Sequence, residues 1–213
     1  MVEATKAAYE KEPDEEKATA VLSALWDLGD YFYELRKLDD AETAYTDMQI
    51  FSEKCCSLYD DVYFNRAKSV SYIELGIIAN AKGDLTTAEE YYQQEITIAK
   101  ALAEETKMVE ARRDLAISYN KLGNIAWANS DLTTAEEYYQ QGFTIRKALA
   151  EETKTVESYE DLAISYYRLG FLLRSKEMLE KAIIIWENLS EQCSNGWKYE
   201  NYILNAELMK GNC

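Results

Sequence analysis

The stretch Asp84-Leu-Thr-Thr-Ala-Glu-Glu-Tyr-Tyr-Gln-Gln94 occurs a second time, residue for residue, at positions 131–141. Around it, residues 84–123 and 131–170 are identical at 31 of 40 positions, at a constant offset of 47 residues. A repeat of this kind is typical of solenoid proteins, in which each unit buries its apolar face against its neighbours. The sequence therefore predicts a repeat fold.

Two weaker copies extend the same frame on both sides. Five columns recur at the 47-residue spacing: the Leu and the Gly of a Leu-Gly pair, a Leu nine residues after the Gly, an Ala twelve residues after it, and an aromatic residue four further on. In order along the chain, the glycines are Gly29, Gly76, Gly123 and Gly170, the alanines are Ala41, Ala88, Ala135 and Ala182, and the aromatic residues are Tyr45, Tyr92, Tyr139 and Trp186. Four copies are thus expected, at approximately 14–60, 61–107, 108–154 and 155–193.

Each copy is predicted to be a pair of helices, because its apolar residues recur at intervals of three and four. First helices are expected near 14–37, 61–82, 108–129 and 155–175, and second helices near 39–58, 85–105, 132–152 and 178–193. Pro13 is placed at the first helical position, and Asp84 and Asp131 are expected N-caps. The Gly column falls inside a helix, where Gly costs about 1 kcal/mol relative to Ala, so we expect a neighbouring helix to approach closely there.

This pattern resembles the tetratricopeptide repeat, and its period, longer than the usual 34 residues, resembles the long-helix variant of kinesin light chains. The resemblance implies an all-α, right-handed α-solenoid of four helix pairs. We expect one domain over residues 1–213, closed by a capping helix at 197–209. The sequence departs from the family pattern at the small residue expected late in each second helix, a position that holds Met48, Glu95, Gly142 and Leu189.

Composition limits the chemistry. The chain has 23 Lys and Arg, 39 Asp and Glu and no His, for a net charge of −16. This balance disfavours nucleic acid and anionic membranes as partners. The missing His removes the commonest general base and transition-metal ligand, and no phosphate-binding loop or nucleophile motif is present. We therefore expect a non-enzymatic protein without metal or cofactor. The start of the chain lacks a signal-peptide core, and we expect a cytoplasmic location.

Several residue clusters have both a functional and a structural interpretation, and the structural one is favoured in each case. Cys55-Cys56 is interpreted as one buried and one exposed thiol on a helix rather than as a metal or redox site. The cysteine spacing, completed by Cys193 and Cys213, fits neither a disulfide framework nor a zinc site. Other clusters are assigned to core or solvated helix surfaces: Tyr91-Tyr92, Tyr138-Tyr139, Arg112-Arg113 and the Glu-Glu pairs at 89–90, 104–105, 136–137 and 151–152.

The resemblance also implies a groove lined by the first helix of each pair. Its exposed positions fall three and two residues before each Gly and one, four and five residues after it. From these positions we predict a peptide-binding face made of Trp26, Asp30, Tyr33, Ile77, Asn80, Asn120, Lys121, Asn124, Trp127, Tyr167, Arg168, Phe171 and Arg174.

The residue types on this face suit an extended peptide. Asn side chains can both donate to and accept from a peptide backbone, aromatic rings offer rigid apolar contact, and Arg can hold a carboxylate. Residues 1–61 contain 6 Lys and Arg against 16 Asp and Glu. The expected partner segment is therefore basic toward the first copy and acidic toward the third and fourth. The pattern does not fit the family's carboxylate clamp for peptide C-termini, because the second copy has Ile77 at a position that the clamp needs.

These observations favour a protein- or peptide-binding scaffold. Two alternatives remain: a regulatory module that senses a signalling peptide, and a structural solenoid that assembles through its ends. Homo-oligomers through the solenoid ends are therefore possible.

Overall fold

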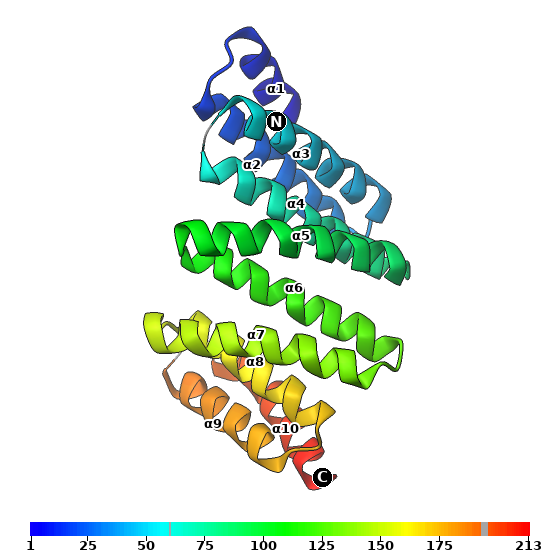
Figure 1. Cartoon of the computed structure of the whole chain (residues 1–213), viewed down its shortest axis with the longest axis vertical. Coiled ribbons are helices and arrows are strands. Elements are labelled where there is room, and N and C mark those ends of the chain that lie inside the picture. Colours follow the sequence, from blue (N-terminus) through cyan, green and yellow to red (C-terminus); the bar gives the residue numbers. More distant parts are fainter. Residues whose placement is uncertain (60, 193–195) are drawn as a thin grey trace. The chain divides into compact units, whose positions relative to one another are not determined.

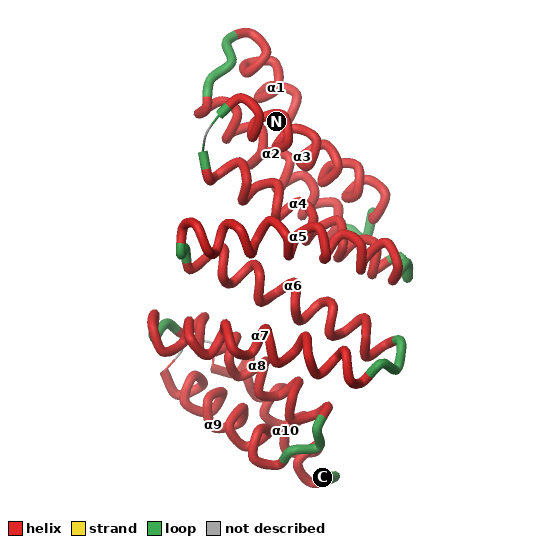
Figure 2. Tube along the Cα trace, viewed as in Figure 1, coloured by secondary structure: helices red, strands yellow, loops and turns green. Residues whose placement is uncertain are grey.

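The structure is a computed structural model, which describes residues 1–59, 61–192 and 196–213. Within these ranges the chain is helical, with short turns and no strands (Figure 2). The predicted all-α fold of successive helix pairs is confirmed. The helices are α1 (Val2–Lys11), α2 (Glu15–Glu34), α3 (Leu38–Leu58), α4 (Val62–Ala81), α5 (Leu85–Thr106), α6 (Val109–Ala128), α7 (Leu132–Thr153), α8 (Val156–Leu172), α9 (Lys176–Gln192), the 3₁₀ turn η1 (Gly196–Tyr199) and α10 (Glu200–Gly211) (Figure 1).

The chain divides into two compact units, residues 1–118 and 119–213, with the boundary inside α6. In the first unit, α2 packs on α3, α3 on α4, and α4 on α5, while α1 covers α2. In the second unit, α7 packs on α8, α8 on α9, and α9 on α10. The prediction of a single domain stays a prediction. Cys193 lies outside the described residues.

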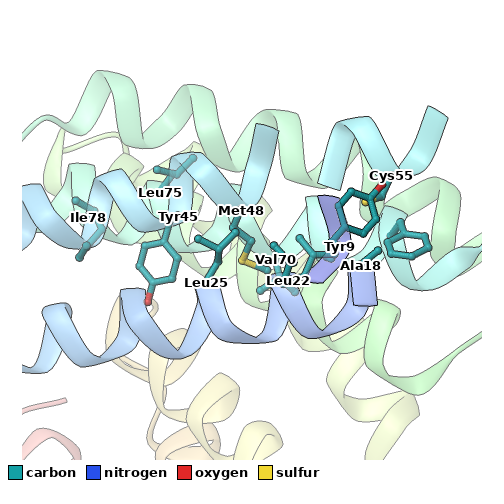
Figure 3. Close-up of a cluster of buried hydrophobic side chains, with 14 residues drawn as sticks. Tyr9, Ala18, Leu22, Leu25, Tyr45, Met48, Cys55, Val70, Leu75 and Ile78 are labelled. Atoms are coloured by element: carbon teal, nitrogen blue, oxygen red, sulfur yellow. The ribbon is translucent and has the colours of Figure 1, made fainter. Parts of the chain in front are cut away.

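The core of the first unit is a continuous apolar cluster contributed by α1 to α4. Leu25, Tyr45 and Met48 meet between α2 and α3, and Val70 and Leu75 come from α4 (Figure 3). These side chains are at most 5 % exposed. The cluster continues to Tyr9 of α1, whose ring meets that of Phe51 edge-on at 5.1 Å.

The Gly column allows an aromatic ring to lie against the first helix of a pair. A Cβ on Gly29 would be 2.4 Å from the ring of Tyr45, and one on Gly76 would be 2.5 Å from that of Tyr92. In the second unit, a Cβ on Gly123 would be 2.5 Å from the Tyr139 ring. The expected close approach at these glycines is confirmed, and it is made by the aromatic column itself.

Helix starts follow the predicted caps with one exception. The side chains of Asp84 and Asp131 accept hydrogen bonds from the backbone N–H of the third residue beyond, at 3.0 and 3.1 Å, as N-caps do. Pro13 is not the first helical residue, so that prediction was wrong. Asp14 is the N-cap, because its carboxylate accepts the Lys17 N–H at 2.7 Å, and α2 therefore begins at Glu15.

The N-terminal end of the chain differs from the sequence-based expectation, and the C-terminal end agrees with it. Helix α1 was not predicted, because it is short and only Tyr9 is buried from it. The expected capping helix at 197–209 is present as η1 followed by α10. It packs on α9 (Figure 1). Among the described helices, none is both long enough and apolar enough to cross a bilayer.

Candidate binding site

The second unit contains an aromatic-rich hollow, which we call the aromatic cavity. Its volume is about 390 Å³. Helix α8 supplies half of the lining, because residues 164, 167, 168, 171 and 172 fall on one face at helical spacing. The lining residues are Asn124, Trp127, Tyr139, Ile164, Tyr167, Arg168, Phe171, Leu172, Trp186 and Tyr202.

Five of the predicted binding residues line the cavity. They are Asn124, Trp127, Tyr167, Arg168 and Phe171. Trp127 of α6 meets Phe171 of α8 edge-on, with ring centroids 5.9 Å apart. Phe171 and Tyr167 lie on the same helix, with their centroids 6.5 Å apart. The Trp127 side chain remains 48 % exposed. These residues were predicted to lie along a groove in the third and fourth copies, and the structure brings them together around the aromatic cavity.

Asn124 organises the polar part of the cavity. Its side-chain oxygen accepts a hydrogen bond from the Tyr139 hydroxyl at 2.8 Å and another from Nη1 of Arg168. The Arg168 guanidinium also lies 5.9 Å from the centre of the Tyr139 ring. Burial raises the pKa of Tyr139, and the neighbouring guanidinium opposes this rise. Tyr139 therefore stays protonated at neutral pH and acts as the donor to Asn124.

Arg168 is the cation of the cavity, and its charge is not neutralised within the described part of the chain. Its interactions there are the hydrogen bond to Asn124 and the contact with the Tyr139 ring, and no described carboxylate forms an ion pair with it. In a chain of net charge −16, an unneutralised guanidinium beside exposed aromatic rings is able to receive a carboxylate.

The remaining predicted residues of the second unit lie outside the cavity. Asn120 is only 4 % exposed. With its amide oxygen directed at Arg146, it accepts a hydrogen bond from Nη2 of that residue at 2.9 Å. Arg146 is itself buried and donates to the Ser165 hydroxyl at 3.2 Å. Asn120 is therefore an interior residue rather than the exposed groove position that was expected. Lys121 is half-buried and Arg174 is exposed.

The predicted residues of the first unit are more dispersed. Trp26 is 36 % exposed and borders a small hollow of about 30 Å³ next to Tyr63 and Arg66. Asp30 is engaged, because it accepts a hydrogen bond from the Tyr45 hydroxyl at 2.5 Å. Tyr33 and Ile77 are half-buried and Asn80 is exposed.

Sequence reasoning missed the part of the cavity that second helices and the cap provide. Trp186 was assigned to the packing column, and Tyr202 to the capping helix. Their rings stack, with centroids 5.3 Å apart and planes inclined at 23°. Ile164 and Leu172 were missed as well, although their spacing from Arg168 places all three on one helix face.

Successive helix pairs define this chain as an α-helical repeat protein. The tetratricopeptide repeat family model matches residues 114–188. The predicted resemblance to the tetratricopeptide repeat is confirmed over this segment, which includes most of the aromatic cavity.

Solved structures show the same fold. One is BtubC (BKLC) from P. vanneervenii, at 19 % identity and a TM-score of 0.66, with 98 % of this chain and 83 % of that chain covered. Another is a putative kinesin light chain of Podosopora anserina with nearly identical repeats, at 16 % identity and a TM-score of 0.53, covering 88 % of this chain and 90 % of that one. No curated protein sequence matches the chain.

Proposed function

We propose that this chain is a non-enzymatic scaffold that binds a segment of a partner protein through the aromatic cavity of its second unit. The observation that carries the proposal is the convergence of Asn124, Trp127, Tyr167, Arg168 and Phe171 on one hollow. Exposed aromatic residues and Arg are the side chains that most often dominate binding at protein interfaces. The tetratricopeptide fold supports the same class of function.

The size and chemistry of the cavity favour a large apolar side chain as the anchor of the partner. A volume of about 390 Å³ falls in the range of ligand pockets, which combine apolar walls with a few fixed polar groups. The polar groups here are the amide NH₂ of Asn124 and the Arg168 guanidinium. The amide NH₂ is suited to a backbone carbonyl of the partner.

The charge of the partner segment follows from the same residues. Arg168 in the cavity, with exposed Arg174 further along the chain, favours acidic residues in the part of the segment that meets the second unit. On the first unit, Asp30 accompanies Trp26 and Tyr33, which favours a basic segment there. These preferences concern each unit by itself.

A selection from a phage-displayed library of random dodecapeptides tests the proposal. Wild-type protein is expected to enrich a family of sequences that Phe171→Ala and Arg168→Glu proteins do not retain. Ile184→Ala is the matched control, because Ile184 lies on α9, is 50 % exposed and does not line the cavity. Enrichment that survives both cavity substitutions would refute the site.

Light scattering on the same preparations addresses the assembly alternative. A concentration-dependent oligomer, together with a library that enriches no peptide, would favour the self-assembling solenoid. A monomer that enriches peptides favours the scaffold. A peptide-induced change in scattering radius would point to the regulatory sensor.

A further inference from the structure

The C-terminal helix α10 contributes directly to the aromatic cavity, although its predicted task was only to cover the last repeat. Tyr202 lines the cavity from α10 and is 45 % exposed. Its ring stacks on Trp186 of α9, which is almost fully buried. One wall of the cavity therefore exists only while α10 is packed on α9.

A run of aromatic rings connects this wall to the opposite side of the cavity. From Trp127, it passes through Phe171, Tyr167 and Trp186 to Tyr202, and successive ring centroids are 5.3 to 6.5 Å apart. Rings at these separations are in contact range. A side chain inserted among them touches the wall that α10 provides.

The attachment of α10 rests on a small group of side chains, of which Tyr199 and Ala206 belong to the buried apolar cluster around Trp186 and Ile203 packs against it. Tyr199 is fully buried, and its hydroxyl lies 3.3 Å from Oε2 of Glu160 on α8. Lys198 forms an ion pair with the same oxygen at 3.0 Å. Within α10 itself, Ala206 is the buried residue. Glu160 thus joins both residues that precede α10 to the body of the unit.

Other features indicate that the packing of α10 on the rest of the unit is weak. The helix has 12 residues and no side-chain N-cap bond, and isolated helices of this length are marginal in water. Leu204 and Leu208 are 57 % and 59 % exposed. The buried indole Nε1 of Trp186, beneath Tyr202, has no hydrogen-bond partner in the described ranges, which costs free energy. Elements with so few buried contacts open at low free energy.

We propose that docking of α10 and occupancy of the aromatic cavity are coupled, so that the cap acts as a closing wall whose position regulates binding. This inference rests on the proposed function. A partner that touches Tyr202 binds the docked state more tightly than the undocked one and therefore shifts the population toward docking. By linkage, any change that releases α10 weakens binding by the same coupling factor.

A pair of substitutions on α10 tests the wall. The probe is the synthetic dodecapeptide recovered most often in the selection described above, with its affinity measured by titration calorimetry. Tyr202→Ala is expected to weaken binding about tenfold, the scale of an aromatic contact at an interface. Leu204→Ala, on the same helix but outside the cavity lining, is expected to bind like the wild type. Equal binding by all three proteins would overturn the inference.

Hydrogen exchange on the wild-type chain tests the coupling without any substitution. At a peptide concentration ten times its Kd, amide exchange in α10 is expected to slow about fivefold, because the undocked state lacks the Tyr202 contact and binds the peptide about tenfold more weakly. Glu160→Gln, which weakens the Lys198 and Tyr199 contacts, is expected to speed exchange in α10. Glu180→Gln on α9 is the matched control and is expected to leave exchange unchanged. Unchanged exchange of α10 on peptide addition contradicts the coupling.

Different results would overturn the binding site and the role of α10. Peptides that depend on Phe171 but not on Tyr202 retain the binding site and overturn the role of α10. If the library enriches no peptide, or if the enriched peptides bind the Phe171→Ala and Arg168→Glu proteins as well as the wild type, both the binding site and the role of α10 are overturned.

Discussion

At the scale of single residues, the contact between Gly and Tyr explains two columns of the repeat at once. The ring of Tyr92 occupies the space that a side chain at Gly76 would need. The last copy has Trp186 in place of Tyr, and the residue facing Gly170 there is Leu179, 2.9 Å from an added Cβ. In the first three copies, the Gly and the Tyr are therefore matched in size. In the last copy, Leu179 fills the space beside the Gly, and Trp186 lines the aromatic cavity instead.

Gly76→Ala is predicted to destabilise the protein although Ala is the better helix former. The new Cβ would lie 2.5 Å from the buried Tyr92 ring, and overpacking costs about 1–3 kcal/mol, more than the roughly 1 kcal/mol that Ala gains in a helix. Urea unfolding followed by circular dichroism measures the balance. Gly211→Ala is the control, because no atom lies within 4 Å of its added Cβ, and it is expected to be neutral or slightly stabilising. Equal midpoints for Gly76→Ala and the wild type would contradict the prediction.

A buried carboxyl group is a second residue-scale feature, at a position where the sequence departs from the family pattern. Glu95 is fully buried on α5. Oε1 accepts a hydrogen bond from Ser69 of α4 at 3.0 Å, whereas the buried Oε2 has no hydrogen-bond partner among the described residues. Burial, reinforced by the nearby Asp114 carboxylate, raises the pKa of Glu95 to about 8. Asp114 is itself paired with Arg66 at 3.0 Å.

Glu95 is predicted to make the protein less stable as the pH rises from about 5 to 8. The folded state keeps the proton on Glu95 until the pH approaches its pKa of about 8, whereas the unfolded chain releases it near the ordinary pKa of 4.5. The free energy of unfolding therefore falls with rising pH and levels off above the folded-state pKa. Glu95→Gln, which cannot ionise, is expected to be similar to the wild type at pH 5 and clearly more stable at pH 8. Parallel stability curves for the two proteins would show that Glu95 does not titrate abnormally.

At the scale of helices, the junctions that follow α5 and α7 have the same conformation, whereas α3 ends at Tyr59 in an extended conformation. Helices α5 and α7 both end at a Lys in the left-handed conformation, Lys107 with φ 55° and Lys154 with φ 52°. Gly is the residue usually found at this C-terminal position, because it lacks the Cβ that makes the left-handed region unfavourable.

Lys154→Gly is predicted to stabilise the protein by up to about 1 kcal/mol, since it removes this steric penalty at some cost in unfolded-state entropy. Thermal unfolding monitored by circular dichroism measures the effect. Lys147→Gly makes the same exchange inside α7 and is expected to destabilise by about 1 kcal/mol. The prediction fails if both substitutions lower the melting temperature.

At the scale of the whole molecule, the excess of acidic side chains dominates the electrostatics. A net charge of −16 on 213 residues repels itself in the folded state. Exposed ion pairs such as Lys82 with Asp39 and Glu42 contribute little each. Screening the repulsion is therefore expected to outweigh the weakening of these pairs.

The melting temperature is accordingly predicted to rise by a few degrees when NaCl is increased from about 20 to 200 mM, over which the Debye length falls by roughly a factor of three. Choline chloride at the same concentrations should give the same rise, because the effect needs ionic strength and not a bound cation. A fall in melting temperature with salt would indicate that attractive pairs dominate instead.

Much of the architecture followed from the sequence because periodicity is a local property. The spacing of apolar residues predicted every paired helix to within a few residues, and the Gly column predicted a close approach. Helix α1 was not predicted from the sequence, because a single buried residue, Tyr9, gives almost no periodic pattern of apolar residues. Pro13 was misplaced because both Pro13 and Asp14 suit a helix start, and the hydrogen bond from the Lys17 N–H decided between them.

The repeat pattern by itself determined the fold and which helix faces would offer candidate binding residues, since both depend on spacing along one chain. Which of these candidates contact one another depends on how the helices pack. The tertiary structure placed Asn120 in the interior beside Arg146, because the Arg146 guanidinium needs an acceptor there. It gathered five of the other candidates around the aromatic cavity, and it brought Tyr202 of the cap onto Trp186 as the wall. Contacts of this kind join residues far apart in sequence, and their geometry is fixed by side-chain packing rather than by spacing.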